Sequence, residues 1–103
     1  MKLVMEIVGA IKYLHSNNII HRDIKPCNIL IQRNRAKLAD FGFAVKASSH
    51  TVKDGYKIGT PIYMSPEALF SKEYSKKSDV WSLGVTIYEL LEGRSPWAAQ
   101  TEL

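Results

Sequence analysis

Four short blocks of the sequence carry residue types that could do chemistry. The first is His21–Asn28, with the sequence HRDIKPCN, and Asp40–Gly42 begins twelve positions after it ends. The third block is Gly59–Glu67 and the fourth is Asp79–Gly84. Each has a structural explanation by itself, since Asp-Phe-Gly is commonly a turn and a lone histidine commonly belongs to a core. All four, in this order and spacing, would need four separate structural explanations, so together they indicate a functional site.

These blocks resemble the C-terminal lobe of eukaryotic protein kinases, and the resemblance covers essentially the whole chain. His21–Asn28 follows the catalytic-loop pattern H-R-D-L-x-x-x-N, with Ile24 in place of the leucine. Asp40–Gly42 follows the metal-binding D-F-G pattern, and Ser65–Glu67 stands where the family has A-P-E. The resemblance implies phosphoryl transfer from ATP, a reaction that depends mainly on positioning and charge neutralisation.

The branch of the family and three catalytic roles follow from the resemblance. Lys25, two positions after Asp23, and Thr60 after a glycine resemble the serine/threonine branch, whereas tyrosine kinases usually differ at both places. Asp23 would accept the proton of the substrate hydroxyl, and Lys25 would neutralise charge on the transferred phosphate. Thr60 would hydrogen-bond to both residues. The implied function is a serine/threonine protein kinase acting on a protein substrate.

The resemblance also implies two cofactors, ATP and Mg²⁺. Asn28 and Asp40 would supply oxygen ligands to the metal, because Mg²⁺ is a hard cation that takes one or two protein ligands beside phosphate oxygens. Lys25 and Leu30 would contact the nucleotide. The implied partners are therefore ATP and a protein that carries the phosphorylated hydroxyl.

Five further residues would support this site. Phe41 and His21 would pack as an apolar column behind the metal, and Gly42 completes the D-F-G block. Asp79, at the start of a buried helix, would accept main-chain N–H groups of the catalytic loop, a place where the helix dipole favours a carboxylate. Glu67 would lack the arginine that normally pairs with it.

Regulation is expected at the loop that follows Asp-Phe-Gly. In the family, the arginine at the position of Arg22 often binds a phosphate on this loop, and such charge-assisted pairing orders a loop. Asp54 could supply part of that charge permanently. The alternative is an unmodified, solvated loop. The candidate phosphosites are Thr51, Ser48, Ser49 and Tyr56, the last standing four positions before Thr60.

The sequence pattern also predicts the elements that must position these residues. Together they make a mainly α fold with a small β-hairpin, which belongs to the α+β class. Apolar residues at helical spacing predict a helix over residues 2–16, and Ile19-Ile20 an extended piece. We expect a hairpin of residues 29–31 and 36–38 around Arg33-Asn34, and a long polar loop over 43–59. A helix should begin at Ser65-Pro66, and another should run over 79–92 between Ser78 and Gly93.

The helix expected over 79–92 is apolar nearly all round, which predicts burial on several sides. One face is formed by Val80, Leu83, Ile87, Tyr88 and Leu91, and Trp81 is expected in the core. A chain this short has few elements to cover such a helix. We therefore also expect large apolar patches to face solvent, where a docking partner could bind.

Composition bounds the class of protein. The chain has 103 residues, of which 46% are hydrophobic and 23% charged, which fits one globular domain and excludes disordered, collagen-like and mucin-like chains. The net charge of +4 is scattered, so solvated faces are expected rather than a nucleic-acid surface. Cys27, expected as a buried thiol, has no partner for an intramolecular disulfide. With no signal peptide or membrane span in the sequence, we expect an intracellular, cytoplasmic protein.

Two interpretations of the whole chain remain open at this point. In the first, residues 1–103 are a partial kinase domain, the core of the C-terminal lobe without the N-terminal lobe and later helices, and inactive when isolated. In the second, the chain is a pseudokinase-like module that binds a protein through its apolar faces. The intact Asp23, Lys25, Asn28 and Asp40 favour the first, because a binding module has no chemical need for them.

Overall fold

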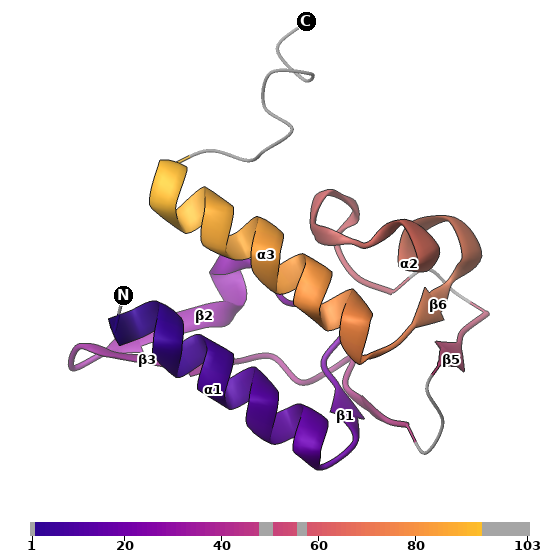
Figure 1. Ribbon diagram of the computed structural model, residues 1–103, viewed down its shortest axis with the longest axis horizontal. Helices are drawn as coiled ribbons and strands as arrows, with labels where there is room; N and C mark the ends of the chain where they lie inside the picture. Colours follow the sequence, from indigo (N-terminus) through magenta and orange to yellow (C-terminus); the bar gives the residue numbers. More distant parts are fainter. Residues whose placement is uncertain (1, 48–50, 56–57, 94–103) are drawn as a thin grey trace, which may run out of the picture.

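The computed structural model describes residues 2–47, 51–55 and 58–93, which form a mixed α+β fold (Figure 1). In chain order the elements are α1 (Lys2–Ser16), β1 (Ile19–Ile20), the 3₁₀ turn η1 (Pro26–Asn28), β2 (Ile29–Gln32), β3 (Arg35–Leu38), β4 (Val45–Lys46), β5 (Val52–Lys53), the 3₁₀ turn η2 (Pro61–Tyr63), α2 (Pro66–Ser71), β6 (Glu73–Tyr74) and α3 (Lys76–Glu92). Helices α1 and α3 lie side by side and run in opposite directions. The catalytic-loop block begins directly after β1 and ends with the turn η1.

Helix α1 has the limits that its apolar spacing predicts. Ile7 and Ile11, one helical turn apart, are buried, whereas Leu3 is exposed near the start of the helix. Together with Ile24 and Leu83 they form one core cluster. Because Ile24 belongs to the catalytic-loop block and Leu83 to α3, this cluster fixes the loop between the two long helices.

The predicted hairpin is present as β2 and β3, paired antiparallel with Ile29 opposite Leu38. Its turn residues Arg33 and Asn34 both have positive φ, 53° and 62°, the backbone twist that tight hairpins favour. Ile29, Ala36 and Leu38 pack against the α1–α3 core cluster. The hairpin therefore holds the end of the catalytic-loop block close to the start of the Asp-Phe-Gly block.

Glu6 ties α1 to this hairpin. Its Oε1 accepts a 3.0 Å hydrogen bond from the Ala36 main-chain N–H, and its other oxygen pairs with the Arg35 guanidinium. The Ala36 hydrogen bond first, and then Arg35, hold the pKa of the Glu6 carboxyl below its ordinary value. The charged form of Glu6 thus helps to dock the hairpin on the helix.

The start of α3 differs from the prediction. The N-cap is Ser75, whose Oγ accepts a hydrogen bond from the Lys77 main-chain N–H. Ser78, which we expected as the cap, lies inside the helix, and its Oγ accepts a hydrogen bond from the Ser75 N–H at 2.9 Å. The two serines form a reciprocal capping box, so the helix begins one turn earlier than a cap at Ser78 would require. Its end at Gly93, with φ of 77°, is as predicted.

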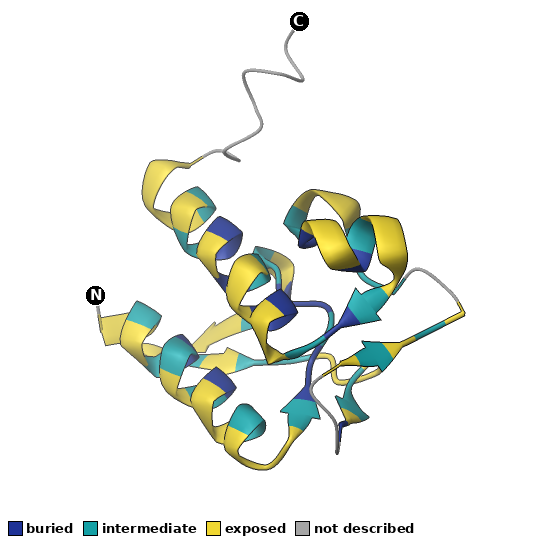
Figure 2. Cartoon of the chain, turned by 45° about the vertical axis from the view of Figure 1, so that its right-hand side comes forward, coloured by how far each residue is buried: buried dark blue, intermediate teal, exposed yellow. Residues whose placement is uncertain are grey.

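The expected burial of α3 on several sides is wrong for the described residues. Leu83, Val85 and Thr86 are buried, but the opposite side is exposed, and Figure 2 shows this outer side in yellow. Trp81, expected in the core, is 40% exposed. The other exposed apolar residues of α3 are Val80, Tyr88, Leu90 and Leu91. The expectation of apolar surface facing solvent is confirmed, because α1, the short strands and the 3₁₀ turns cover one side of the helix.

The described residues of 43–59 differ from the long loop that we expected, because some of them form short strands. The segment contributes β4, which pairs antiparallel with β1, and β5, which pairs antiparallel with β6. The described residues therefore form three separate two-stranded sheets rather than the one predicted hairpin. Strands of two residues are too short to show a periodic pattern, and tertiary pairing is what makes them extended. Both pairings lie beside the catalytic-loop block.

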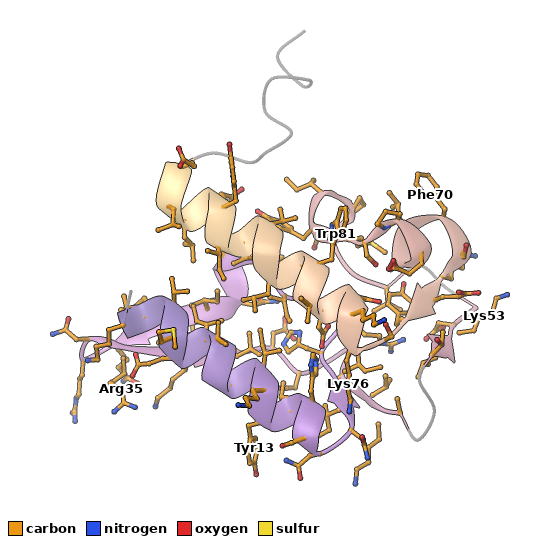
Figure 3. The ribbon with its side chains drawn as sticks, viewed as in Figure 1. Tyr13, Arg35, Lys53, Phe70, Lys76 and Trp81 are labelled. Atoms are coloured by element: carbon orange, nitrogen blue, oxygen red, sulfur yellow. The ribbon has the colours of Figure 1, made fainter. Side chains whose placement is uncertain are left out.

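The second core cluster lies at the other end of the molecule. It consists of Met64, Ala68 and Tyr74, so it joins the end of η2 and helix α2 to β6. Phe70 on the same helix is 82% exposed and points away from the body of the fold, as does Tyr13 of α1 (Figure 3).

The exposure of Cys27 differs from the prediction. Cys27 was expected to be a buried thiol and is exposed, because η1 turns its side chain out of the loop while the neighbouring Asn28 is buried. In the described part of the chain, no helix is long and apolar enough to cross a membrane.

Candidate active site

Asp23, Lys25 and Thr60 meet around one carboxylate. Thr60 Oγ1 donates a 3.2 Å hydrogen bond to Asp23 Oδ1, and Lys25 Nζ donates a 2.8 Å hydrogen bond to Thr60 Oγ1. Lys25 Nζ also lies 3.8 Å from Asp23 Oδ2. The hydrogen bonds predicted for Thr60 are therefore present, and residues 35 or more positions apart in the sequence share one site.

Asn28 closes the same loop from the other side. It is buried, and its Nδ2 donates to the Asp23 main-chain oxygen at 2.7 Å and to Asp23 Oδ2 at 3.3 Å. The turn η1, which begins at Pro26, brings Asn28 back toward Asp23. Since both of these bonds use the amide nitrogen, Asn28 Oδ1 is the atom suited to serve as a metal ligand.

The residues on both sides of Asp40 contact the catalytic-loop block. The Ala39 main-chain N–H donates to the Asn28 oxygen at 2.8 Å, and the rings of Phe41 and His21 meet edge to face with centroids 5.2 Å apart. Asp40 itself is exposed, and its Oδ1 accepts from the Gly42 N–H at 3.3 Å. Asp23 and Asp40 thus lie on segments packed against each other, as the expected site requires.

His21 is a structural link rather than an exposed catalytic imidazole. The ring is fully buried, its Nδ1 accepts a 3.1 Å hydrogen bond from the Asp23 N–H, and its Nε2 lies 2.9 Å from the Ala39 oxygen. Because Nδ1 accepts, the neutral ring carries its proton on Nε2 and donates it to Ala39. The imidazole therefore joins the main chains before Asp40 and at Asp23.

Asp79 holds the start of the catalytic loop, as predicted. The side chain is 1% exposed; its Oδ2 accepts from the His21 N–H at 2.8 Å and its Oδ1 from the Arg22 N–H at 3.0 Å. A carboxylate in the first turn of α3 also faces the positive end of the helix dipole. The carboxylate thereby fixes the backbone just before Asp23.

His15 is a further partner of Asp79 that the sequence reasoning missed. Its Nε2 lies 2.9 Å from Asp79 Oδ2 and donates to that carboxylate. His15 stands in the last turn of α1, four residues after the buried Ile11 and hence on the same side of the helix. That spacing was the available signal for it.

Arg22 is enclosed by several segments. Its side chain is 6% exposed; Nη1 donates to Asp54 Oδ2 at 2.8 Å and Nε to the Phe43 oxygen at 2.8 Å. Its Cζ lies 5.1 Å from the centre of the Tyr74 ring, within the range of a cation–π contact. Asp54, which we expected to supply a permanent negative charge to this loop, therefore forms an ion pair with Arg22.

Two of the six non-glycine residues that have positive φ in the described part of the chain lie at this site. Arg22 and Asp40 are non-glycine residues with positive φ, 74° and 57°, and Gly59 has φ of 117°. A Cβ on Gly59 would lie 2.9 Å from the Arg22 main-chain oxygen, so the third block approaches the loop too closely for a side chain. Such backbone is kept where the surrounding contacts hold it, commonly at functional sites.

The remaining expected site residues lie outside this cluster. Leu30 is exposed on β2, and Glu67 is exposed on α2. Thr51 is exposed beside β5. The candidate phosphosites Ser48, Ser49 and Tyr56 fall outside the described residues.

A second polar contact beside the site was not foreseen. The Tyr63 hydroxyl donates to the Glu89 carboxylate, whose oxygens lie 2.9 and 3.0 Å away. Burial, and then the hydrogen bond to Glu89, raise the pKa of Tyr63 to about 12. This contact ties the turn η2, next to Thr60, to the last turn of α3.

The donor set fits magnesium with a nucleotide better than a metal held by protein alone. Within residues 2–47, 51–55 and 58–93, no three His, Cys, Asp or Glu side chains are grouped so that they could hold a metal ion. Mg²⁺ bound to a nucleotide commonly takes one or two protein oxygens beside phosphates and water. Asn28 Oδ1 and the Asp40 carboxylate are such oxygens.

Comparison with known proteins agrees with this geometry. The sequence matches the protein kinase domain family over residues 1–103. It is similar to serine/threonine-protein kinase TIO of Arabidopsis thaliana, at 49% identity over 96 residues, covering 92% of this chain and 7% of that protein. Serine/threonine-protein kinase ULK3 of Xenopus laevis is 44% identical over 101 residues, covering 95% of this chain and 21% of that protein.

A third relative extends over almost the whole chain. Serine/threonine-protein kinase CLA4 of Saccharomyces cerevisiae is 42% identical over 102 residues, which cover 98% of this chain and 12% of that protein. The chain thus spans about a fifth or less of the length of these relatives. The match over its full length, with the four sequence blocks gathered at one place, leads to one conclusion: the chain belongs to the protein kinase family.

Proposed function

We propose that residues 1–103 form the core of the C-terminal lobe of a serine/threonine protein kinase, which transfers the γ-phosphate of ATP to a hydroxyl of a protein substrate. The observation that supports this most strongly is that the Asp23 carboxylate is contacted by the side chains of Thr60, Lys25 and Asn28. Phosphoryl transfer needs an oriented carboxylate, a cation and metal-binding oxygens in one place. These groups supply each of the three.

Asp23 is the proposed acceptor of the proton from the substrate hydroxyl. Its Oδ1 accepts from Thr60, and its Oδ2 faces Lys25 and the Asn28 amide. These contacts fix the plane of the carboxylate, while His21 and Asp79 fix the main chain around it. A base held in one orientation needs less rearrangement when the substrate hydroxyl arrives.

Lys25 is the proposed cation for the transferred phosphate. Its ammonium is held by Thr60 Oγ1 at 2.8 Å and lies 3.8 Å from Asp23. The lysine is therefore placed within reach of both the base and the group that the base activates. An ammonium has three donors, so the bond to Thr60 leaves others for a phosphate oxygen.

Asn28 and Asp40 are the proposed protein ligands of Mg²⁺, and the exposed Leu30 is the proposed apolar contact for the nucleotide. When bound, Mg²⁺ neutralises charge on the phosphate oxygens. The chain's own part is to hold Asn28 through Asp23, and Asp40 through its neighbours Ala39 and Phe41.

The test is phosphotransfer from radiolabelled ATP to a serine- and threonine-containing protein by the full product of the gene. Asp23→Asn should lower kcat by about 10²- to 10⁴-fold, the usual contribution of a general base. Glu92→Gln, at the exposed end of α3, removes one carboxylate charge elsewhere and should leave kcat unchanged. Equal activity of Asp23→Asn and the wild type, or phosphate found on tyrosine alone, would contradict the proposal.

The isolated 103 residues are expected to show no phosphotransfer. They contain no glycine-rich phosphate loop and no lysine on a preceding strand, the parts that cover the nucleotide in the family. The exposed apolar side of α3 should also make their unfolding poorly cooperative. Turnover by the isolated chain that Asp23→Asn abolishes would contradict this expectation. If the full gene product itself transfers no phosphate, the alternative of a protein-binding module is favoured instead.

A further inference from the structure

We propose that Asp54 is a positioning residue for this reaction, acting through Arg22 on Asp23, and that the charge it supplies belongs to the sequence rather than to a modification. This inference rests on the proposed function and concerns the regulation of the same site. The ion pair of Arg22 Nη1 with Asp54 Oδ2, at 2.8 Å, is its starting point.

The environment of Arg22 requires a counter-charge. A guanidinium cannot lose its proton in a protein, and a buried charge is costly unless it is paired and hydrogen-bonded. The Arg22 side chain is 6% exposed, and Asp54 is the acid that the described residues place at ion-pair distance from it. The Phe43 oxygen and the Tyr74 ring complete the enclosure without adding a full negative charge.

The position of Asp54 is set by the small sheet of β5 and β6. Val52 pairs with Tyr74 and Lys53 with Glu73, and the Asp54 N–H continues the pairing by donating to the Lys72 oxygen at 3.1 Å. The same sheet carries Tyr74, whose ring lies against Arg22. Two groups that hold the guanidinium, Asp54 directly after β5 and Tyr74 in β6, are therefore placed by one small sheet.

Arg22 in turn lies directly beside the proposed base. Its main-chain N–H is bound by Asp79, and its main-chain oxygen lies so close to Gly59 that a Cβ there would approach to 2.9 Å. Its φ of 74° is unusual for arginine and persists because contacts on several sides hold it. Releasing the guanidinium would relax this backbone and with it the contact of Asp23 with Thr60.

Arg22 and Asp54 together thus connect four segments: the catalytic loop, Phe43 after Asp-Phe-Gly, β5 and β6. A phosphorylated side chain can order a loop by pairing with arginine, and a carboxylate of the sequence does so with one negative charge and no kinase upstream. The contact should therefore be formed in the unmodified protein.

The first experiment compares Asp54→Asn and Asp54→Glu in the full gene product. Loss of a charge-assisted hydrogen bond should lower kcat about tenfold or more in Asp54→Asn, with KM for ATP changed less than twofold, and Asp54→Glu should restore most of kcat. Glu92→Gln is the charge-matched control and should match the wild type. An Asp54→Asn enzyme with wild-type kcat, or one that Asp54→Glu does not rescue, would overturn the proposal.

The second experiment reads the contact without activity, so it remains decisive if the proposed function fails. Limited trypsin digestion after Lys46 and Lys53, which lie between the two contacts of Arg22 at Phe43 and Asp54, should be faster in Asp54→Asn than in the wild type or Glu92→Gln. Figure 3 shows the Lys53 side chain pointing outward, where a protease can reach it. Equal cleavage rates in all three proteins would contradict the role of Asp54.

The third experiment tests the independence from modification. Treatment of the purified wild-type protein with a broad-specificity phosphatase, confirmed by intact mass, should leave both kcat and the trypsin cleavage rate unchanged. A loss of activity together with faster cleavage would show that a phosphate, not Asp54, supplies the charge that Arg22 needs, and would overturn the inference.

Discussion

The main-chain N–H of His21 donates a 2.8 Å hydrogen bond to the carboxylate of Asp79, 58 positions later in the sequence. The same carboxylate accepts from the Arg22 N–H and from the His15 ring. One buried acid at the start of α3 therefore joins the end of α1 to the catalytic loop.

Removing this acid should destabilise the fold. Asp79→Ala leaves two main-chain N–H groups and the His15 ring without their acceptor, which should cost about 3 kcal/mol of unfolding free energy. Asp79→Asn keeps one acceptor oxygen and should cost less. Urea unfolding followed by circular dichroism measures both, and an Asp79→Ala midpoint equal to that of the wild type would contradict the assigned contacts.

Gly59 should not tolerate a side chain. Gly59→Ala would place a Cβ 2.9 Å from the Arg22 oxygen at a φ of 117°, which should cost about 1–3 kcal/mol and displace Thr60 from Asp23. Gly55→Ala is the matched control, since a Cβ there meets no atom within 4 Å. The midpoint temperature of thermal unfolding and the rate of phosphotransfer should both fall for Gly59→Ala and not for Gly55→Ala. Equal midpoints and rates in the two variants would argue against the close approach of Gly59 to Arg22.

The Thr60 hydroxyl should matter more than the shape of its side chain. Thr60→Val keeps the volume but removes the donor to Asp23 and the acceptor for Lys25, so kcat should fall about ten- to a hundredfold. Thr60→Ser retains the hydroxyl and should keep most of the activity. If the serine variant is as impaired as the valine variant, the hydroxyl has no such role.

The Tyr63–Glu89 contact should give a pH dependence at high pH. The pKa of Tyr63 is raised from 10.0 to about 12, so the fold favours the protonated hydroxyl. The resulting stability is fully present below pH 10 and is lost as the pH rises from 10 toward 12. Tyr63→Phe should remove one step of tyrosinate absorbance at high pH, and its free energy of unfolding should change less with pH in that range. Titration of the Tyr63 hydroxyl near pH 10 would contradict the contact with Glu89.

Local signals were sufficient for α1 and the hairpin. Ile7 and Ile11 at helical spacing predicted α1 with the limits that the structure shows. Arg33-Asn34 between two short apolar runs predicted the hairpin, whose strands each extend one residue further toward the turn, to Gln32 and Arg35. The start of α3 was placed too late because Ser75 and Ser78 both suit a cap, and only the reciprocal hydrogen bonds decide between them.

Contacts made by tertiary structure were beyond the sequence. The pairings of β4 and β5 involve two residues each and leave no period to detect. The exposure of Trp81 could not be read from an apolar pattern, because the pattern does not say what covers a helix. The hydrogen bonds of Thr60 and Asp79 were expected from resemblance to a family rather than from spacing, and His15 was found only in the structure.

The central claim is that Asp23 serves as base while Asp40 serves as metal ligand at one site, and a paired binding and activity measurement separates the two roles. Binding of Mn²⁺ with ATP, followed by electron paramagnetic resonance, is measured alongside phosphotransfer for Asp23→Asn and Asp40→Asn in the full gene product. The account predicts that Asp23→Asn binds the metal nucleotide normally and loses activity, whereas Asp40→Asn loses both. Normal metal binding by Asp40→Asn, or full activity of Asp23→Asn, would contradict it.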